Sequence, residues 1–451
     1  MAVDNQTAEY NRMTTEPVSR LVTSLAVPAI VSMMITSVYN LVDTAFVSTL
    51  GTSASGAVGV VFGFMAIIQA FGFMFGQGTG SIVSRALGQR DVARASAHAS
   101  LGFIAAFASG LFIALLSFWQ LDRLVMVLGS TQTIAPYAKT YISLILLAAP
   151  FMCSSFALNN ILRYEGKAVL GTIGMGIGAL LNMLGDFLFM SVLDLGIFGA
   201  GLSTALSELV SWGVLLGMFL RGKTATTLSL HALRQARPSF LADIMATGFP
   251  SLLRQALNSI TTVLLNSCCA VYGDAAVAGM SIVSRVVFFA FSIALGIGQG
   301  FQPVAGFNYG AKQHRRVKEA FRFTCAASQV VIVIGAIILF VFATPIIARF
   351  RDDPEVLMVG VRALRLQAVA LLALPLCVSC EMLYQSCGHR GGATFLSGLR
   401  NGLLFIPLLL LLSATRGLSG IQEAQPLSYV LSFPLTVPFV VRFFRKLPQD
   451  P

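Results

Sequence analysis

The sequence predicts an all-α integral membrane protein in which twelve transmembrane helices form two parallel six-helix repeats. Three observations lead to this prediction: the composition, the number of long apolar segments, and an internal repeat. Of the 451 residues, 56% are hydrophobic and only 11% are charged, and the mean hydropathy is +0.80. A soluble core could not bury that much apolar surface, so the chain is expected to lie in a membrane.

The chain contains roughly a dozen apolar segments, each near the 20 or so residues that a helix needs to cross a bilayer. The first 20 residues, MAVDNQTAEYNRMTTEPVSR, are polar and lack the apolar stretch and cleavage site of a signal peptide. The first helix is therefore expected to be retained. The predicted helices begin near Leu21, Ala57, Ala97, Pro136, Ala168, Phe198, Leu241, Gly279, Ala320, Val356, Gly391 and Ile421.

The distribution of Lys and Arg predicts the orientation. With the N-terminus in the cytoplasm, 19 of the 30 basic residues fall in cytoplasmic segments, 5 in external segments and 6 in or at the ends of helices. Basic residues collect on the cytoplasmic side of membrane proteins, so both termini are expected there. This pattern also explains the net charge of +11, and no nucleic-acid partner is expected.

The internal repeat has a spacing of 222 residues. It aligns Pro28 with Pro250 and the motif GQG at 76–78 with the same motif at 298–300. Six helices are an even number, so both copies enter the membrane in the same direction. The predicted parts are a cytoplasmic N-terminal segment (1–20), a first lobe (21–220), a cytoplasmic linker (221–240), a second lobe (241–445) and a short cytoplasmic tail (446–451). A cavity between two such lobes would suit alternating access.

Two glycine-rich runs, GFMFGQGTG at 72–80 and GTIGMGIG at 171–178, are expected to allow close helix packing and not to bind phosphate. The seven cysteines lie in or next to apolar segments, where thiols pack as small hydrophobic groups. Cys377, Cys380, Cys387 and His389 lack a second close ligand pair. No disulfide, metal site or cofactor is expected.

Four acids lie at membrane depth: Asp43, Asp186, Glu208 and Glu381. An Asp at the centre of a membrane helix costs roughly 2.5 to 3.5 kcal/mol, so each acid needs a partner, a cavity or a proton. Burial in a low dielectric favours the neutral form of a carboxyl group, which suits an acid that loads and releases protons near neutral pH.

Three helices of the first half each place a polar patch beside an acid, which predicts one polar pocket in that half. Within each patch the residues lie on one face of their helix, because they are three or four positions apart. They consist of Tyr39, Asn40 and Asp43; of Asn182 and Asp186; and of Thr204 and Glu208, with Asn159 and Asn160 as further candidates.

The repeat separates these acids from residues that shape the backbone. Asp43 aligns with Leu265, Asp186 with Leu408 and Asn182 with Leu404. A group that only one copy keeps is expected to serve function, so proton or ion handling is predicted for the first half. The alternative is that the acids only hold helices together, as interhelical polar contacts do at about 0.6 kcal/mol on average. That alternative stays open, above all for Glu208.

In the second half, Arg254 or Arg285 is expected to form an internal ion pair with Glu381. Such a pair is more often structural than coupling.

The stretches VYNLVDTAFVS, GQGTGSIVSRALGQRD, NMLGD and GIFGAGLSTALSE resemble those of the multidrug and toxic-compound extrusion (MATE) transporters over about residues 20 to 445. Within that family the chain is most similar to the proton-coupled branch of DinF-like and MepA-like proteins. The resemblance implies a V-shaped two-lobe bundle in the bacterial inner membrane. It implies a monomeric antiporter, not an enzyme, that exports small organic, often cationic, compounds in exchange for protons and has membrane lipids as its other partners.

The resemblance also implies that Asp43 is the protonation site and that Tyr39, Asn159, Asn182, Asp186 and Thr204 surround it. A branch of the family with an acid in the seventh helix uses sodium, and this chain has Arg254 and Asn258 in that helix. Sodium binding in the first half stays open, because Asp43, Asn182, Asp186 and Thr204 offer oxygen ligands.

Two other functional classes are alternatives. A flippase of lipid-linked sugars would share the architecture but would need several basic residues for pyrophosphate, and only Arg254, Arg285 and Arg400 are candidates. An intramembrane aspartyl protease would need the motif G-x-G-D, whereas residues 183–186 read MLGD.

Overall fold

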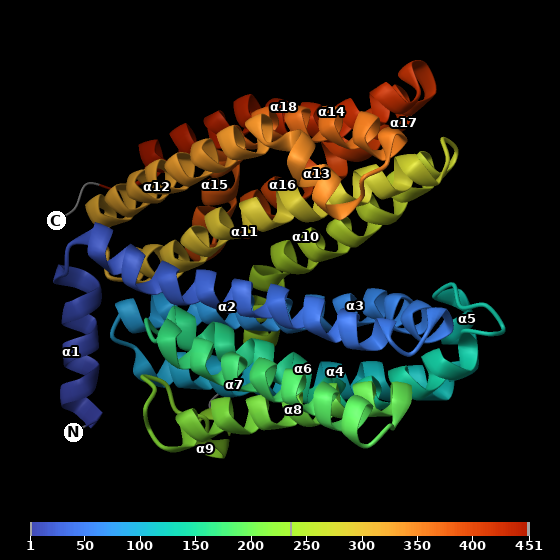
Figure 1. Ribbon diagram of the computed structural model, residues 1–451. Helices are drawn as coiled ribbons and strands as arrows, with labels where there is room; N and C mark the ends of the chain where they lie inside the picture. Colours follow the sequence, from blue (N-terminus) through green and yellow to red (C-terminus); the bar gives the residue numbers. More distant parts are fainter. Residues whose placement is uncertain (1, 235–236, 449–451) are drawn as a thin grey trace. The chain divides into compact units, whose positions relative to one another are not determined.

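A computed structural model of the protein describes residues 2–234 and 237–448 (Figure 1), and these residues form helices joined by short turns. The chain divides into two compact units. Unit 1 comprises residues 1–16 and 31–252, and unit 2 comprises residues 17–30 and 253–451. Helices α2 and α10 are each divided between the two units.

Unit 1 holds most of the first repeat. Its helices are α1 (Ala2–Thr15), most of α2 (Val18–Ser48), α3 (Thr52–Gly88), α4 (Val92–Trp119), α5 (Leu121–Val127), α6 (Ala135–Tyr164), α7 (Ala168–Asp186), the π-helical turn η1 (Phe187–Val192), α8 (Gly196–Leu220), α9 (Leu230–Arg234) and the start of α10 (Pro238–Ala270).

Unit 2 holds the start of α2 and most of the second repeat. Its helices are the rest of α10, α11 (Asp274–Gly310), α12 (His314–Val341), α13 (Ala343–Phe350), α14 (Pro354–Leu371), α15 (Leu374–Ser386), α16 (Arg390–Gly398), the π-helical turn η2 (Leu399–Leu404), α17 (Phe405–Arg416) and α18 (Leu418–Lys446).

The prediction of an all-helical protein with many spans is confirmed. Among the described residues, ten helices are long and apolar enough to cross a membrane, or eleven if the bent pair α14 and α15 is counted as one span. The twelfth predicted span, near Leu241, corresponds to α10, a 33-residue helix that is not among these candidates. Polar residues such as Arg254 and Asn258 make α10 less apolar than the candidate spans.

Helix α1 was not expected from the polar N-terminal sequence. It is stabilised by local charges, since Arg12 contacts Glu9 at 3.3 Å and Glu16 at 3.4 Å. The guanidinium of Arg90 lies 4.2 Å from the ring centre of Tyr10 and so attaches α1 to the turn after α3.

The backbone repeats with the predicted spacing. Helices α3 and α11 both have 37 residues, and α4 and α12 both have 28, with each pair offset by 222. Positive φ angles recur at aligned turns, with Arg90 at 61° and Lys312 at 60°. Strained backbone is costly for residues with a Cβ, so its recurrence shows that the two copies share turn geometry as well as helix length.

One element breaks this symmetry. Helix α6 is continuous for 30 residues, whereas the aligned α14 and α15 bend by 54° at residues 372–373. Pro375 lies in the first turn of α15. Proline lacks an amide hydrogen and favours the start of a new helix, which explains the break.

The GQG motifs bring helices into backbone contact in both units. A Cβ on Gly78 would lie 2.3 Å from the carbonyl oxygen of Ile244 at the start of α10, and a Cβ on Gly300 would lie 2.4 Å from the amide nitrogen of Ala26 in α2. A Cβ on Gly78 would also lie 2.9 Å from the amide nitrogen of Gly248, and Gly248 aligns with Ala26 at the repeat spacing, so the two contacts are equivalent. This contact explains why the start of each repeat's first helix belongs to the unit of the other repeat.

We expect Gly248→Ala to destabilise the protein strongly. A Cβ there would lie 1.8 Å from the carbonyl oxygen of Met74, and backbone cannot move aside as a flexible side chain can. Overpacking of this kind costs about 1 to 3 kcal/mol or more. Thermal unfolding of the detergent-purified protein measures the change. The matched control is Gly63→Ala, because a Cβ on Gly63 has open space within 4 Å; equal stability of the two variants would contradict the prediction.

The segment after α8 is bound to the ends of α4 and α6 within unit 1. The buried carboxylate of Glu165 accepts hydrogen bonds from the amides of Ala225 at 2.8 Å and Thr226 at 3.2 Å. The amide of Thr227 donates to Ser96 at 3.1 Å. The segment is therefore part of the packed structure of unit 1.

Glu165 gives this attachment a pH dependence. Burial raises the pKa of Glu165 to about 7, although the hydrogen bonds from Thr226 and Ala225 oppose this rise. In the folded protein Glu165 keeps its proton up to about pH 7, whereas in the unfolded chain it releases the proton near pH 4.5. The protonated carboxyl group therefore contributes its full stabilisation of the fold below pH 4.5, and this contribution is lost as the pH rises to about 7. Glutamine cannot ionise, so Glu165→Gln should abolish this pH-dependent loss of stability, which amounts to at most roughly 3 kcal/mol.

Thermal unfolding between pH 5 and pH 8 tests this expectation. The variant should show a flatter dependence of stability on pH than the natural protein. Glu319→Gln, at an exposed position, is the control and should leave the dependence unchanged. Parallel curves for all three proteins would contradict the assignment.

Candidate functional site

Close packing of α7 on α8 positions the polar residues of the first half. A Cβ on Gly174 would lie 2.4 Å from Leu215, and one on Gly178 would lie 2.8 Å from Ser211. The prediction that this glycine run allows close helix contact is confirmed. Helix α7 ends at Asp186, where the backbone changes to the π-helical turn η1, a feature frequent at functional sites.

Asp43 of α2 and Asp186 of α7 lie together in unit 1 and interact with each other. The exposed fraction of Asp43 is 8%, and that of Asp186 is 0%. Neither carboxylate oxygen of Asp186 has a hydrogen-bond partner, and the same holds for Oδ1 of Asp43. Two adjacent buried carboxyl groups thus have unused acceptor capacity.

A hydrogen-bond network between α7 and α8 lies beside this pair. The amide nitrogen of Asn182 donates to Thr204 at 3.3 Å and to Ser203 at 3.4 Å. The hydroxyl of Ser203 donates in turn to the backbone carbonyl of Asn182 at 2.8 Å. Oδ1 of Asn182 has no partner, so it adds another free oxygen to the site.

A cavity of about 40 Å³ lies between α2, α6, α7 and α8. Its lining includes Tyr39, Asn182, Thr204 and Glu208, together with Ser155, whose buried hydroxyl has no partner. The cavity has room for a water molecule or a small cation and is too small for a drug-sized molecule. Each of the three predicted polar patches therefore contributes a residue to this cavity, whose described lining does not include Asp43 or Asp186.

Tyr141 of α6 was missed by the sequence analysis. Its side chain is 1% exposed, contacts Thr204 and lies within electrostatic reach of Asp43 and Asp186. A tyrosine in an apolar helix is usually an ordinary core residue. Comparison of the two repeats could have identified Tyr141, because it aligns with Ala363, just as Asp43 aligns with Leu265.

Two other expected members lie apart from the acid pair. Asn159 packs against the start of α7, where a Cβ on Gly171 would lie 2.7 Å from its side-chain nitrogen. Gly171 and Asp186 are about four helical turns apart, so Asn159 does not reach the acids. Asn160 instead accepts a hydrogen bond from Arg163. The side chain of Asn40 lies outside the described residues.

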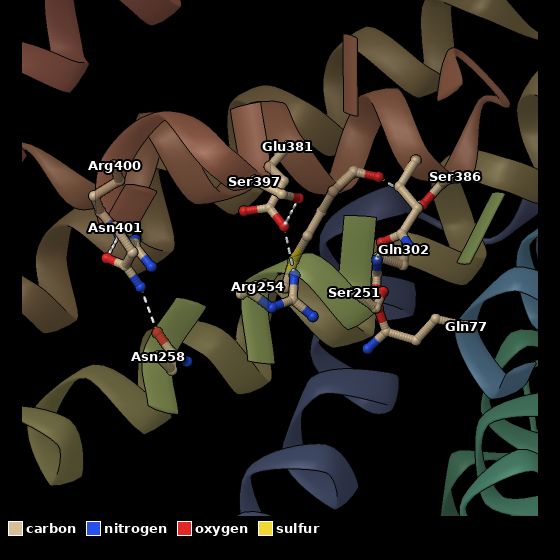
Figure 2. Close-up of polar contacts among 12 residues, drawn as sticks. Gln77, Ser251, Arg254, Asn258, Gln302, Glu381, Ser386, Ser397, Arg400 and Asn401 are labelled. Atoms are coloured by element: carbon tan, nitrogen blue, oxygen red, sulfur yellow. Dashed lines mark hydrogen bonds and ion pairs between the residues drawn. The ribbon is translucent and has the colours of Figure 1, made fainter. Parts of the chain in front are cut away.

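In unit 2, Arg254 is the partner of Glu381. The guanidinium Nη1 of Arg254 lies 2.5 Å from Oε1 of Glu381, and both side chains are buried. Ser397 donates a hydrogen bond to the same carboxylate at 2.7 Å. Figure 2 shows Arg254 and Ser397 directed at the Glu381 carboxylate. Arg285, the other predicted candidate, is exposed on α11 and does not form the pair.

Near this ion pair, the amide of Asn401 donates a hydrogen bond to Asn258 (Figure 2). Asn401 lies in η2, next to Arg400, whose guanidinium lies 5.4 Å from the ring centre of Phe291 and 5.5 Å from that of Tyr429. In the second half, the buried charges of Arg254 and Glu381 therefore neutralise each other, and the guanidinium of Arg400 lies against aromatic rings.

The two halves differ chemically in this respect. In the part of the chain that the structure describes, no Lys, Arg or His forms an ion pair with Asp43 or Asp186. Two ionised carboxylates side by side at low dielectric repel each other, so the pair requires a proton or a bound cation. Carboxylate, amide and hydroxyl oxygens also suit a hard cation such as sodium.

Comparison with known proteins agrees with this description. The MatE family model matches residues 28–188 and 250–436, one segment in each repeat. The multidrug export protein MepA of Staphylococcus saprophyticus is 26% identical over 397 residues, which cover 88% of this chain and 87% of that protein. MepA of Staphylococcus aureus is 25% identical over 406 residues, which cover 90% and 89%.

Solved structures show the same fold. A transporter of the MOP superfamily from Pyrococcus furiosus has a TM-score of 0.91 at 23% identity, and the match covers 97% of this chain and 98% of that one. An outward-facing multidrug resistance MATE family transporter has a TM-score of 0.90 at 23% identity, with the same coverage. The family match extends over most of both repeats, and the chain is a member of the MATE family of membrane transporters.

Proposed function

We propose that this protein exports organic compounds, organic cations among them, across the bacterial inner membrane in exchange for protons. Asp43 and Asp186 form the coupling site. Tyr39, Asn182, Thr204 and Glu208 form its polar surroundings. The curated relatives named multidrug export proteins support the substrate class.

The observation that carries the proposal is the buried carboxyl pair, which no Lys, Arg or His among the described residues neutralises. Asp186 is fully buried and neither of its oxygens accepts a hydrogen bond. An unpaired carboxylate at low dielectric is costly, and a proton removes that cost. The pair therefore binds a proton most strongly when it is sealed from water and releases it when the pocket opens, which is the property that a coupling site needs.

Alternating access follows if the two protonation states favour different conformations. In the ionised state, Asp43 and Asp186 favour the conformation that holds a cationic substrate. A proton that enters from outside neutralises the site, rearranges the first helix and releases the substrate, after which the lobes rock inward. A proton that bound equally well to both conformations would not shift the equilibrium between them.

The proposal includes the organisation of the chain. The lobes at 21–220 and 241–445 move relative to each other, the segment at 221–240 connects them in the cytoplasm, and both termini face the cytoplasm. The loop charges support this orientation, with 19 basic residues on the proposed inner side and 5 on the outer side.

Sodium coupling through the same pocket is the second candidate. The free oxygens of Asp43, Asp186 and Asn182 favour it, because they are ligands of the kind that hard cations prefer. A flippase of lipid-linked sugars gains no support from the arginines. Arg254 is bound to Glu381, and Arg400 lies beside two aromatic rings.

Transport by the purified protein in sealed vesicles tests the proposal. Efflux of a fluorescent organic cation such as ethidium is followed under an imposed pH gradient, with and without sodium. We expect export to follow the pH gradient in the absence of sodium. Export that requires a sodium gradient at fixed pH would move coupling to sodium, and export that ignores both gradients would refute antiport.

A further inference from the structure

Glu208 of α8 is a third acid at membrane depth in unit 1, besides the pair of Asp43 and Asp186. It lines the cavity of about 40 Å³, whose described lining includes no other acid and no basic residue. Among the described residues, Glu208 forms no hydrogen bond and no ion pair. A carboxyl group at this depth without a partner is costly, so a function is expected for it.

The cavity contains polar atoms that no described protein group uses. The buried hydroxyl of Ser155 has no partner, and Oδ1 of buried Asn182 has none either. Tyr39, which also lines the cavity, lies within electrostatic reach of Glu208 and of both members of the acid pair. Free polar groups around a volume with room for water are the composition of a path for protons.

The cavity lies on one side of the acid pair along the helices. On α2, Tyr39 precedes Asp43 by four positions, which is about one helical turn. On α7, Asn182 precedes Asp186 by the same interval. Both helices begin at the cytoplasmic side in the orientation proposed above, so Glu208 lies between the acid pair and the cytoplasm.

Polar groups continue from the cavity toward the starts of α2 and α7. Thr36, which lines the cavity, donates a hydrogen bond to the backbone carbonyl of Ser32 at 2.9 Å. The hydroxyls of Ser32 and Thr172 lie 2.8 Å apart and hydrogen bond across the two helices. Asn159, which lies apart from the acids, packs beside the neighbouring Gly171. These residues extend the row of polar groups away from the acid pair.

The aligned positions in unit 2 hold two interacting side chains. At the spacing of 222, Gly178 of the cavity lining aligns with Arg400. At a spacing of 221, which the glycines at 196 and 417 share, Glu208 aligns with Tyr429. The guanidinium of Arg400 lies 5.5 Å from the ring centre of Tyr429. The first repeat therefore has a glycine and an acid beside a cavity where the second has a packed pair.

We propose that Glu208 carries protons from the acid pair to the cytoplasm, an inference that rests on the proposed proton-driven export. The protonated pair gives its proton to a water molecule in the cavity, and the carboxylate of Glu208 takes a proton from that water. The pair is then ionised and Glu208 is neutral, so the total charge is unchanged. Glu208 next releases the proton to water on the cytoplasmic side and returns to its ionised form.

Two transport modes of the full-length protein in sealed vesicles test this role. Net export of ethidium under an imposed pH gradient requires proton release in every cycle. Exchange of labelled for unlabelled ethidium at equal pH on both sides requires no net release. The variants are Glu208→Gln, which cannot ionise, and Glu208→Asp, which keeps a carboxyl group. Asp122→Asn removes an exposed acid of unit 1 and is the control.

We expect Glu208→Gln to lower the initial rate of net export roughly 10-fold or more, since positioned proton-transfer groups contribute about 10² to 10⁴-fold. Its rate of exchange should stay close to that of the natural protein. Glu208→Asp should recover most of the net export, and Asp122→Asn should match the natural protein in both modes.

Unchanged net export by Glu208→Gln would overturn the inference. Equal losses in both modes would overturn it as well, because they would assign Glu208 a structural role. In both cases proton-driven export by the natural protein would stand. Export by the natural protein that ignores the pH gradient would instead refute the proposed function, and the proton path with it.

Discussion

Asp43→Asn is expected to reduce export driven by a pH gradient to the level of vesicles without protein. Asparagine has nearly the same shape as aspartic acid but cannot load and release a proton. It also leaves Asp186 without the neighbouring charge with which it shares the buried site. Efflux of an organic cation from vesicles under an imposed pH gradient measures the loss, and the folded fraction is measured in parallel by thermal unfolding.

The control for this variant is Asp122→Asn. Asp122 is an exposed acid on α5 that contacts Lys139 at 2.6 Å, and an exposed pair of this kind contributes about 1 kcal/mol or less. Asp122→Asn should therefore transport like the natural protein. If Asp43→Asn also transported fully, Asp43 would have no part in coupling. A loss of folded Asp43→Asn protein would instead assign Asp43 a structural role.

Glu381→Gln is expected to destabilise unit 2 by about 3 to 5 kcal/mol, because it leaves the buried guanidinium of Arg254 without its counter-charge. Replacing both partners by apolar residues, as in Arg254→Met/Glu381→Leu, should recover most of that loss, since no charge then remains buried. Thermal or denaturant unfolding of the purified protein measures both effects.

Glu423→Gln is the matched control for this second prediction. Glu423 contacts Arg362 at 3.0 Å and Arg416 at 2.9 Å, but the two arginine side chains are 50% and 63% exposed. Water screens such pairs, so the loss should stay near or below about 1 kcal/mol. If Glu381→Gln were no more harmful than Glu423→Gln, the ion pair would not stabilise the second half.

Much of the fold could be predicted from the sequence because it depends on quantities that a sequence carries. Apolar length predicts a spanning helix, and the 222-residue spacing reappears in the aligned lengths of α3 and α11. Helix α10 shows the limit of this reasoning. Its residue Arg254 lowers the apolarity of the segment, and a partner at the distant position Glu381 is what makes its burial tolerable.

The candidate site was predictable only in part. Asp43 and Asp186 were identifiable because a charge at membrane depth is costly and because their repeat partners are leucines. Tyr141 was missed since tyrosine is common in apolar helices, and Asn159 was placed too close to the acids. Side-chain spacing within one helix predicts which residues share a face. It does not predict which turn of a neighbouring helix lies opposite that face.

The sequence by itself determined the membrane environment, the helical class, the two repeats and the half of the molecule that keeps the acids. These follow from composition, from period and from the comparison of one copy with the other. Only the tertiary structure decided that Asp43 meets Asp186 and that Arg254 and not Arg285 pairs with Glu381. The pair of Arg254 and Glu381 joins residues 127 positions apart, and such pairings depend on how closely helices pack at particular glycines, which no local pattern encodes.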